Sequence, residues 1–177
     1  KLMAIKLGST DFADIKLGDK QVSAVYVGDK LVWEKVQTDA DSATFITVAG
    51  LTNQVHKDAV NYLVSQMKSK GLWQKMIAIY PFVGGNANYH KFNLKNPQDS
   101  DAAFRLTFNT VTHSVNGIQY GGADTKVSNA NVNYDNVSLG FYSRTNTANT
   151  GIDIGASNTA ANSRFMIHSR YSDGNAY

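Results

Sequence analysis

The 177-residue sequence contains no cysteine, and this absence excludes several kinds of chemistry. Without thiols the chain has no disulfide, no thiolate metal ligand and no cysteine nucleophile. It also lacks an apolar run of about 18 residues, so we expect no membrane insertion. The histidines show no paired spacing such as i, i+4, and we therefore expect no metal site. They are His56, His90, His113 and His168.

Motifs for phosphate binding and for nucleophilic catalysis are also missing. No nucleophile elbow occurs, and Gly84-Gly85 is not followed by the Lys-Ser/Thr pair that a phosphate-binding loop needs. The net charge of +3 is modest, and the basic residues are spread along the chain, which argues against a nucleic-acid partner. A hydrophobic content of 42% is nevertheless enough for a globular core. We expect a folded protein without a cofactor.

An internal repeat of about ten residues occupies residues 1–35. Glycines at 8, 18 and 28 each follow an apolar pair and precede polar residues, so each predicts a strand that runs into a tight turn. The interpretation is a small β-meander with little core of its own. We expect it to bury Tyr26 and Trp33 against other chains, although an N-terminal extension of the main domain would explain the pattern equally well.

Residues 36–71 read as a polar linker followed by helices. Residues 42–49 favour a helix that ends at Gly50, although their β-branched residues would also suit a strand. Residues 53–70 predict a second helix, with Thr52 as its N-cap and Gly71 at its end. An apolar residue recurs every fourth position and predicts the buried face of this helix. These positions are Val55, Ala59, Leu63 and Met67.

The stretch from 72 to 94 predicts a strand, a loop and a second strand. Residues 76–80 are branched or aromatic and predict a buried strand that Pro81 closes. Gly84-Gly85-Asn86 is typical of a loop, and residues 89–94 alternate as a strand does. Further on, residues 104–108 alternate apolar and polar side chains and predict a half-buried strand.

The remainder of the chain shows short alternating runs separated by turn-rich spacers, which indicates a β-sandwich or a jelly roll. The runs lie at 137–141, 152–154 and 165–167, and the spacers at 120–122, 146–151 and 158–163. A hairpin-turn signal at 172–175 has no returning strand after it. A frayed C-terminus would explain this, but we favour a natural polypeptide that continues past Tyr177, in which case the jelly roll would be incomplete here.

Two adjacent blocks of sequence resemble structural proteins of tailed bacteriophages that infect gut Bacteroidetes, including the crAss-like phages. The first is GLWQKMIAIYPFVGGNANYHKFNLKNPQDSDAAFRLTFN at 71–109, and the segment TDADSATFITVAGLTNQVHKDAVNYLVSQMKSKG leads into it. The resemblance covers residues 38–109 and continues more weakly to Tyr177. It implies a concanavalin A-like jelly-roll domain, a place in the virion and contacts with other virion proteins.

Within that fold class an enzyme is the less favoured interpretation. Jelly-roll glucanases use closely spaced acidic residues on one strand, and Glu34, the only glutamate, lies outside the jelly-roll region. The aspartates of that region are scattered among predicted turns; Asp124, Asp135 and Asp153 could also ligate calcium, but we expect no ion. A glycan would instead need aromatic faces and planar polar groups. Candidates of these types are Tyr120, Asn131, Asn133, Tyr134, Tyr142 and Arg144.

The sequence thus predicts a mainly β chain in three parts. Residues 1–35 form an assembly module, residues 36–71 a linker and helical segment, and residues 72–177 a concanavalin A-like jelly roll. The predicted function is non-enzymatic: a homo-oligomeric head or tail fibre of a bacteriophage that binds host-surface glycans. The alternatives are a carbohydrate-active enzyme of the glucanase type and a capsid decoration protein without a ligand.

Overall fold

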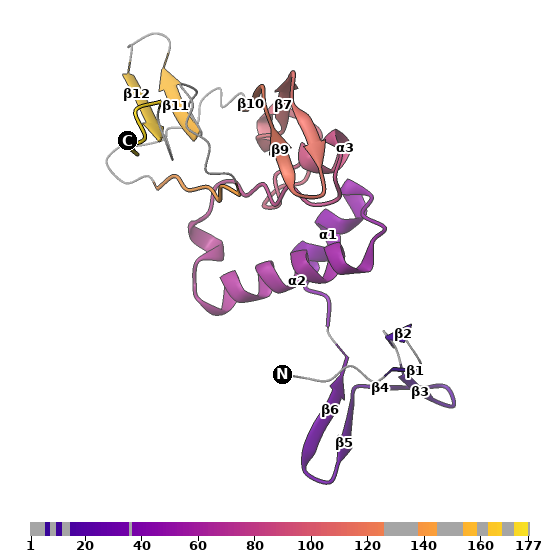
Figure 1. Ribbon diagram of the computed structural model, residues 1–177. Helices are drawn as coiled ribbons and strands as arrows, with labels where there is room; N and C mark the ends of the chain where they lie inside the picture. Colours follow the sequence, from indigo (N-terminus) through magenta and orange to yellow (C-terminus); the bar gives the residue numbers. More distant parts are fainter. Residues whose placement is uncertain are drawn as a thin grey trace. The chain divides into compact units, whose positions relative to one another are not determined.

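The computed structural model describes residues 6–7, 10–11, 15–35, 37–125, 138–144, 154–158, 163–167 and 172–176. These residues contain both helices and strands (Figure 1). The chain divides into two compact units, of which the first is Lys1–Pro81 with Phe92–Gln98 and the second is Phe82–Lys91 with Asp99–Tyr177. The three-part division expected from the sequence stays a prediction.

The N-terminal strands of the first unit form three separate antiparallel hairpins. Within the described residues no strand of one hairpin pairs with the next, so the predicted continuous meander is wrong. The reason is that only Ser23 separates the second hairpin from the third, which leaves no room for a reversing turn. The hairpins are β1 (Lys6–Leu7) with β2 (Thr10–Asp11), β3 (Ile15–Leu17) with β4 (Lys20–Val22), and β5 (Ala24–Val27) with β6 (Lys30–Glu34).

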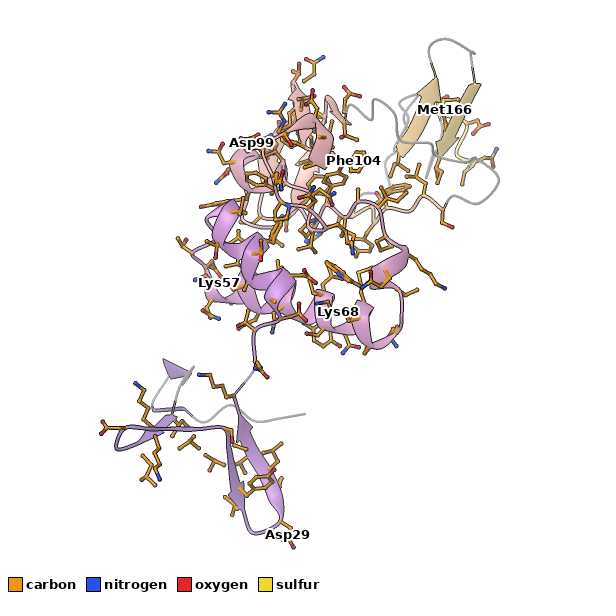
Figure 2. The ribbon with its side chains drawn as sticks, turned by 180° about the vertical axis from the view of Figure 1, so that it is seen from behind. Asp29, Lys57, Lys68, Asp99, Phe104 and Met166 are labelled. Carbon is orange, nitrogen blue, oxygen red and sulfur yellow. The ribbon has the colours of Figure 1, made fainter. Side chains whose placement is uncertain are left out.

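The repeat glycines behave as the sequence predicts. Gly18 has a φ of 62° and Gly28 a φ of 59°, and a left-handed conformation of this kind suits glycine at the first position of a two-residue hairpin turn. Gly8 lies outside the described residues. Asp29 follows Gly28 at the tip of the β5–β6 hairpin (Figure 2).

Two helices follow, as predicted: α1 (Ala40–Ala49) and α2 (Gln54–Ser69). The Asp39 side chain caps α1 by accepting a hydrogen bond from the Asp41 N–H, and Gly50 ends this helix at a φ of 72°. The predicted cap of α2 is wrong by one position, because Asn53 rather than Thr52 accepts the hydrogen bond from the His56 N–H.

The buried face of α2 is not the predicted one. The helix buries Val60, Asn61 and Val64, whereas Val55 is 73% exposed, Ala59 is exposed and Leu63 is half-buried.

A polar contact explains this orientation of α2. The Asn61 Oδ1 accepts hydrogen bonds from the Asp39 N–H at 2.7 Å and from the Ser42 hydroxyl at 2.8 Å, while its Nδ2 donates to the Gln37 carbonyl. Because a buried amide requires hydrogen-bond partners, the face of α2 that carries Asn61 lies against the start of α1.

The strand expected at 76–80 is absent, and this prediction is wrong. After the 3₁₀ turn η1 (Trp73–Lys75) the chain is irregular. The side chain of Asn93 forms the hydrogen bonds that a neighbouring strand would otherwise form with this segment. It accepts from the Ile79 N–H and donates to the Ile77 carbonyl. The strand expected at 89–94 is also wrong, because Asn86 caps a short helix, α3 (Ala87–His90).

The strands of the second unit pair two by two in the described residues, and no barrel closes among them. Residues 138–144, which cover most of one expected run, contain no strand. Phe104, expected within a strand, instead ends η2 (Asp101–Ala103) at a positive φ. The pairs are β7 (Leu106–Asn109) with β10 (Gly122–Thr125), β8 (Thr112–Ser114) with β9 (Gly117–Gln119), and β11 (Ile154–Asn158) with β12 (Ser163–Ile167). The jelly roll itself stays a prediction.

Candidate functional site

Three of the six glycan-binding candidates lie in the described part of the chain. Tyr120 is 73% exposed, Tyr142 is 87% exposed and Arg144 is exposed as well. No hydrogen bond, ion pair or ring contact among the described residues joins these three side chains. The others, Asn131, Asn133 and Tyr134, lie outside the described residues.

The two assembly candidates belong to the β5–β6 hairpin. Tyr26 lies on β5 opposite Leu31 and is 59% exposed. Trp33 pairs through its backbone with Val25, and its side chain lies outside the described residues.

Tyr120 occupies a distinctive place in the second unit, at a break in a long hairpin. Strands β7 and β10 are the outer part of this hairpin and end with the pair Asn109 and Gly122. Strands β8 and β9 are the inner part and begin with the pair Thr112 and Gln119. Residues 110–111 therefore lie opposite residues 120–121, and both stretches leave the ladder at the same level. We call these four residues the hairpin break.

The backbone of the hairpin break is left-handed on both sides. Thr110 has a φ of 57° and Tyr120 a φ of 60°, which is uncommon for side chains of these kinds. Gly121 follows at 65°, and a Cβ on it would lie 2.1 Å from the Asn109 carbonyl oxygen. The two stretches thus approach each other as closely as a glycine allows.

A second feature, which sequence spacing gave no means of finding, is a contact between two histidines. His90 at the end of α3 is only 1% exposed, and its Nδ1 lies 3.0 Å from the Nδ1 of His113 on β8. The Phe82 ring meets His90 edge-on and the Phe108 ring meets His113 in the same manner. The 23-residue separation matches no helical or metal-ligand spacing.

The hydrogen bonds assign the tautomer of this pair. The Gly85 N–H donates to the Nε2 of His90 at 3.2 Å, so the neutral ring accepts there and carries its proton on Nδ1. That proton is donated to the Nδ1 of His113. A metal-bound histidine would instead use its second nitrogen as a donor to a carbonyl or carboxylate. The arrangement therefore fits a structural hydrogen bond between His90 and His113 and does not fit a metal site.

Low pH should weaken the contact of His90 with His113. Burial, and to a smaller extent the charge of His113, lowers the pKa of His90 to about 4 from its usual 6.5. Between these values the unfolded chain binds more protons, so the stabilisation is complete above pH 6.5 and is lost as the pH falls toward 4. We expect a loss of about 1–2 kcal/mol in the free energy of unfolding, measured by urea denaturation at about pH 7.5 and about pH 4.5.

Two variants check that His90 is responsible for this pH dependence of the free energy of unfolding. His90→Gln should remove most of this pH dependence, whereas His56→Gln on α2 should keep it. Ion pairs with lysine and arginine lower the pKa of Asp39 and of Asp99 below the usual 3.8, so most of the stability that these carboxyls contribute is still present at about pH 4.5. An unchanged slope in His90→Gln would contradict this role.

Comparisons of the chain with protein-family models, with curated proteins and with solved structures give no significant match. Within the described residues, no group of three or more His, Asp or Glu side chains is placed to hold a metal ion. In the same part of the chain, none of the helices combines the length and the apolar character that crossing a membrane requires.

Proposed function

We propose that this chain is a non-enzymatic structural component of a bacteriophage particle, a head or tail fibre. Its N-terminal hairpins bind neighbouring chains of the virion, including further copies of this chain. Its C-terminal region adopts a concanavalin A-like jelly roll that binds glycans of the host surface. The resemblance of residues 38–109 to phage structural proteins supports the context, and the exposed apolar side chains of the hairpins support the mode of assembly.

The observation that carries the proposal is the absence of a core in the hairpins. Among residues 15–35, no side chain that the structure describes is buried. Leu17, Tyr26 and Val27 are instead 79%, 59% and 69% exposed. Isolated two-stranded hairpins are marginally stable in water, and large apolar side chains gain about 1.5–3 kcal/mol each when they are buried. A surface of this kind gains stability when another chain covers it.

Strand β5 offers apolar side chains on both of its faces. Successive residues of a strand point to opposite faces, so Tyr26 lies on one face while Val27 lies on the other. Leu31 pairs with Tyr26 and extends the first face. A hairpin that is apolar on both faces suits insertion between other elements better than packing on a single surface.

Several copies acting together would hold a fibre on a particle more firmly than one. The hairpins of one chain bury little area, and a single weak contact dissociates readily. Linked copies make the second and third contacts intramolecular, which raises the overall avidity by about 10²–10⁴-fold without new contacts. This gain is the physical reason to expect a homo-oligomer.

A charged substitution in the hairpin tests the assembly. The full chain should sediment as an oligomer, and Tyr26→Asp should shift it to smaller species, because the carboxylate would have to be buried at the interface. Tyr62→Asp on α2 is the matched control, since Tyr62 is 68% exposed and should leave the mass unchanged. A wild-type chain that sediments as a monomer, or equal effects of both variants, would contradict the proposal. A map of intact particles would test the place in the virion.

A further inference from the structure

We propose that the Tyr120 ring is a stacking platform for an uncharged saccharide, presented outward by the hairpin break. This inference rests on the glycan binding proposed above and names its central residue and the class of sugar. It is carried by three observations: an aromatic side chain that is exposed, a backbone that is strained at that residue, and a surrounding stretch without charged side chains.

The packing of its own side chain does not account for the strained backbone at Tyr120. Two other aromatic residues of this unit also have left-handed backbones, Phe82 at a φ of 48° and Phe104 at 60°. Both are half-buried, and the Phe82 ring packs edge-on against His90 with centroids 5.6 Å apart. Tyr120 has the same unfavourable backbone but leaves 73% of its side chain in solvent.

Glycine or asparagine would occupy position 120 at lower cost, because both tolerate a left-handed backbone better than tyrosine does. The chain thus carries a large exposed ring where a smaller residue would be more stable. Strained residues of this kind cluster at ligand sites. We infer that the ring is present for what it contacts outside the chain.

The chemistry around Tyr120 indicates what that ligand is. Residues 106–123 contain no Lys, Arg, Asp or Glu. Arg105, just before them, is already engaged by Asp99 at 3.0 Å and by Asp101 at 2.8 Å. A phosphate or a nucleic acid would need free cations here.

Neutral polar side chains are exposed on both strands beside the break, namely Asn109, Thr112 and Gln119. Amides and hydroxyls both donate and accept hydrogen bonds, as sugar hydroxyls require, and an aromatic face packs against the C–H groups of a pyranose. These properties together fit a neutral sugar.

The test compares the full-length wild type with Tyr120→Asn and with Thr110→Asn on an array of neutral and anionic saccharides. Both substitutions place asparagine at a left-handed position of the same break, so both should hold or raise the thermal midpoint. Only Tyr120→Asn should weaken binding to the neutral saccharides, by about tenfold or more. Tyr120→Phe should keep most of the binding, because the ring is retained.

Three results would overturn the inference: no binding of the wild type to any neutral saccharide, a preference for anionic ones, or binding by Tyr120→Asn within about twofold of wild type. A lower thermal midpoint for Tyr120→Asn would count against the strain. Tyr120→Asn should leave the sedimenting mass unchanged. Failure of the hairpin assembly is therefore distinguishable from failure of the saccharide platform.

Discussion

Replacing Asn93 by alanine should lower the free energy of unfolding by about 3 kcal/mol or more. The side chain is fully buried and serves three backbone groups. Its Oδ1 accepts from the N–H groups of Ile79 and of Lys95, both at 3.0 Å, and its Nδ2 donates to the Ile77 carbonyl at 3.3 Å. Alanine would leave these three part-buried backbone groups without the partner that the amide supplies.

The matched control is Asn96→Ala, three residues further on. Asn96 is exposed, and its backbone N–H bonds the Asn93 carbonyl irrespective of the side chain. Its replacement should change the unfolding free energy by about 0.5 kcal/mol or less. Urea denaturation at neutral pH measures both variants. Equal stabilities of Asn93→Ala and Asn96→Ala would show that the buried amide does not organise this segment.

Replacing Gly121 by alanine should also cost about 3 kcal/mol or more. The added Cβ would lie 2.1 Å from the Asn109 carbonyl oxygen and 2.5 Å from the carbonyl carbon and oxygen of Thr110. These are backbone atoms, so a rotamer change cannot relieve the clash. The left-handed φ of 65° adds a further penalty for any residue with a Cβ.

Gly122→Ala is the control for this second prediction. Gly122 is the next residue, its φ lies outside the left-handed region, and a Cβ on it would meet nothing within 4 Å. It should be neutral or slightly stabilising, because alanine reduces the conformational freedom of the unfolded chain. Thermal melts of Gly121→Ala and Gly122→Ala measure the difference in stability. Similar midpoints for the two variants would mean that the two sides of the hairpin break are not in close contact.

Features set by neighbouring residues were predictable from the sequence. The glycines at 18 and 28 mark turns because a residue without Cβ takes a positive φ at little cost. Helix α1 ends at Gly50 for the same reason, and α2 spans almost the length that its composition indicates. The lack of cysteine excluded disulfides outright. In each case the deciding interaction lies within a few positions along the chain.

Features set by contacts between distant segments were not predictable. The apolar run at 76–80 has the composition of a strand, yet the amide of Asn93 takes its backbone groups, and nothing in the run itself indicates this. The stripe on α2 has the spacing of a buried face, yet Asn61 turns a different face inward.

The candidate site follows the same rule. Tyr120 was recognisable from the sequence as an aromatic residue beside a turn, but its exposure and its left-handed backbone depend on the approach of residues 109–110 to Gly121. The contact of His90 with His113 joins residues 23 positions apart. Local propensities are worth tenths of a kcal/mol per residue, whereas burying an unsatisfied polar group costs about 1–3 kcal/mol. Tertiary structure therefore decides the local conformation wherever a buried amide, imidazole or carbonyl needs a distant partner.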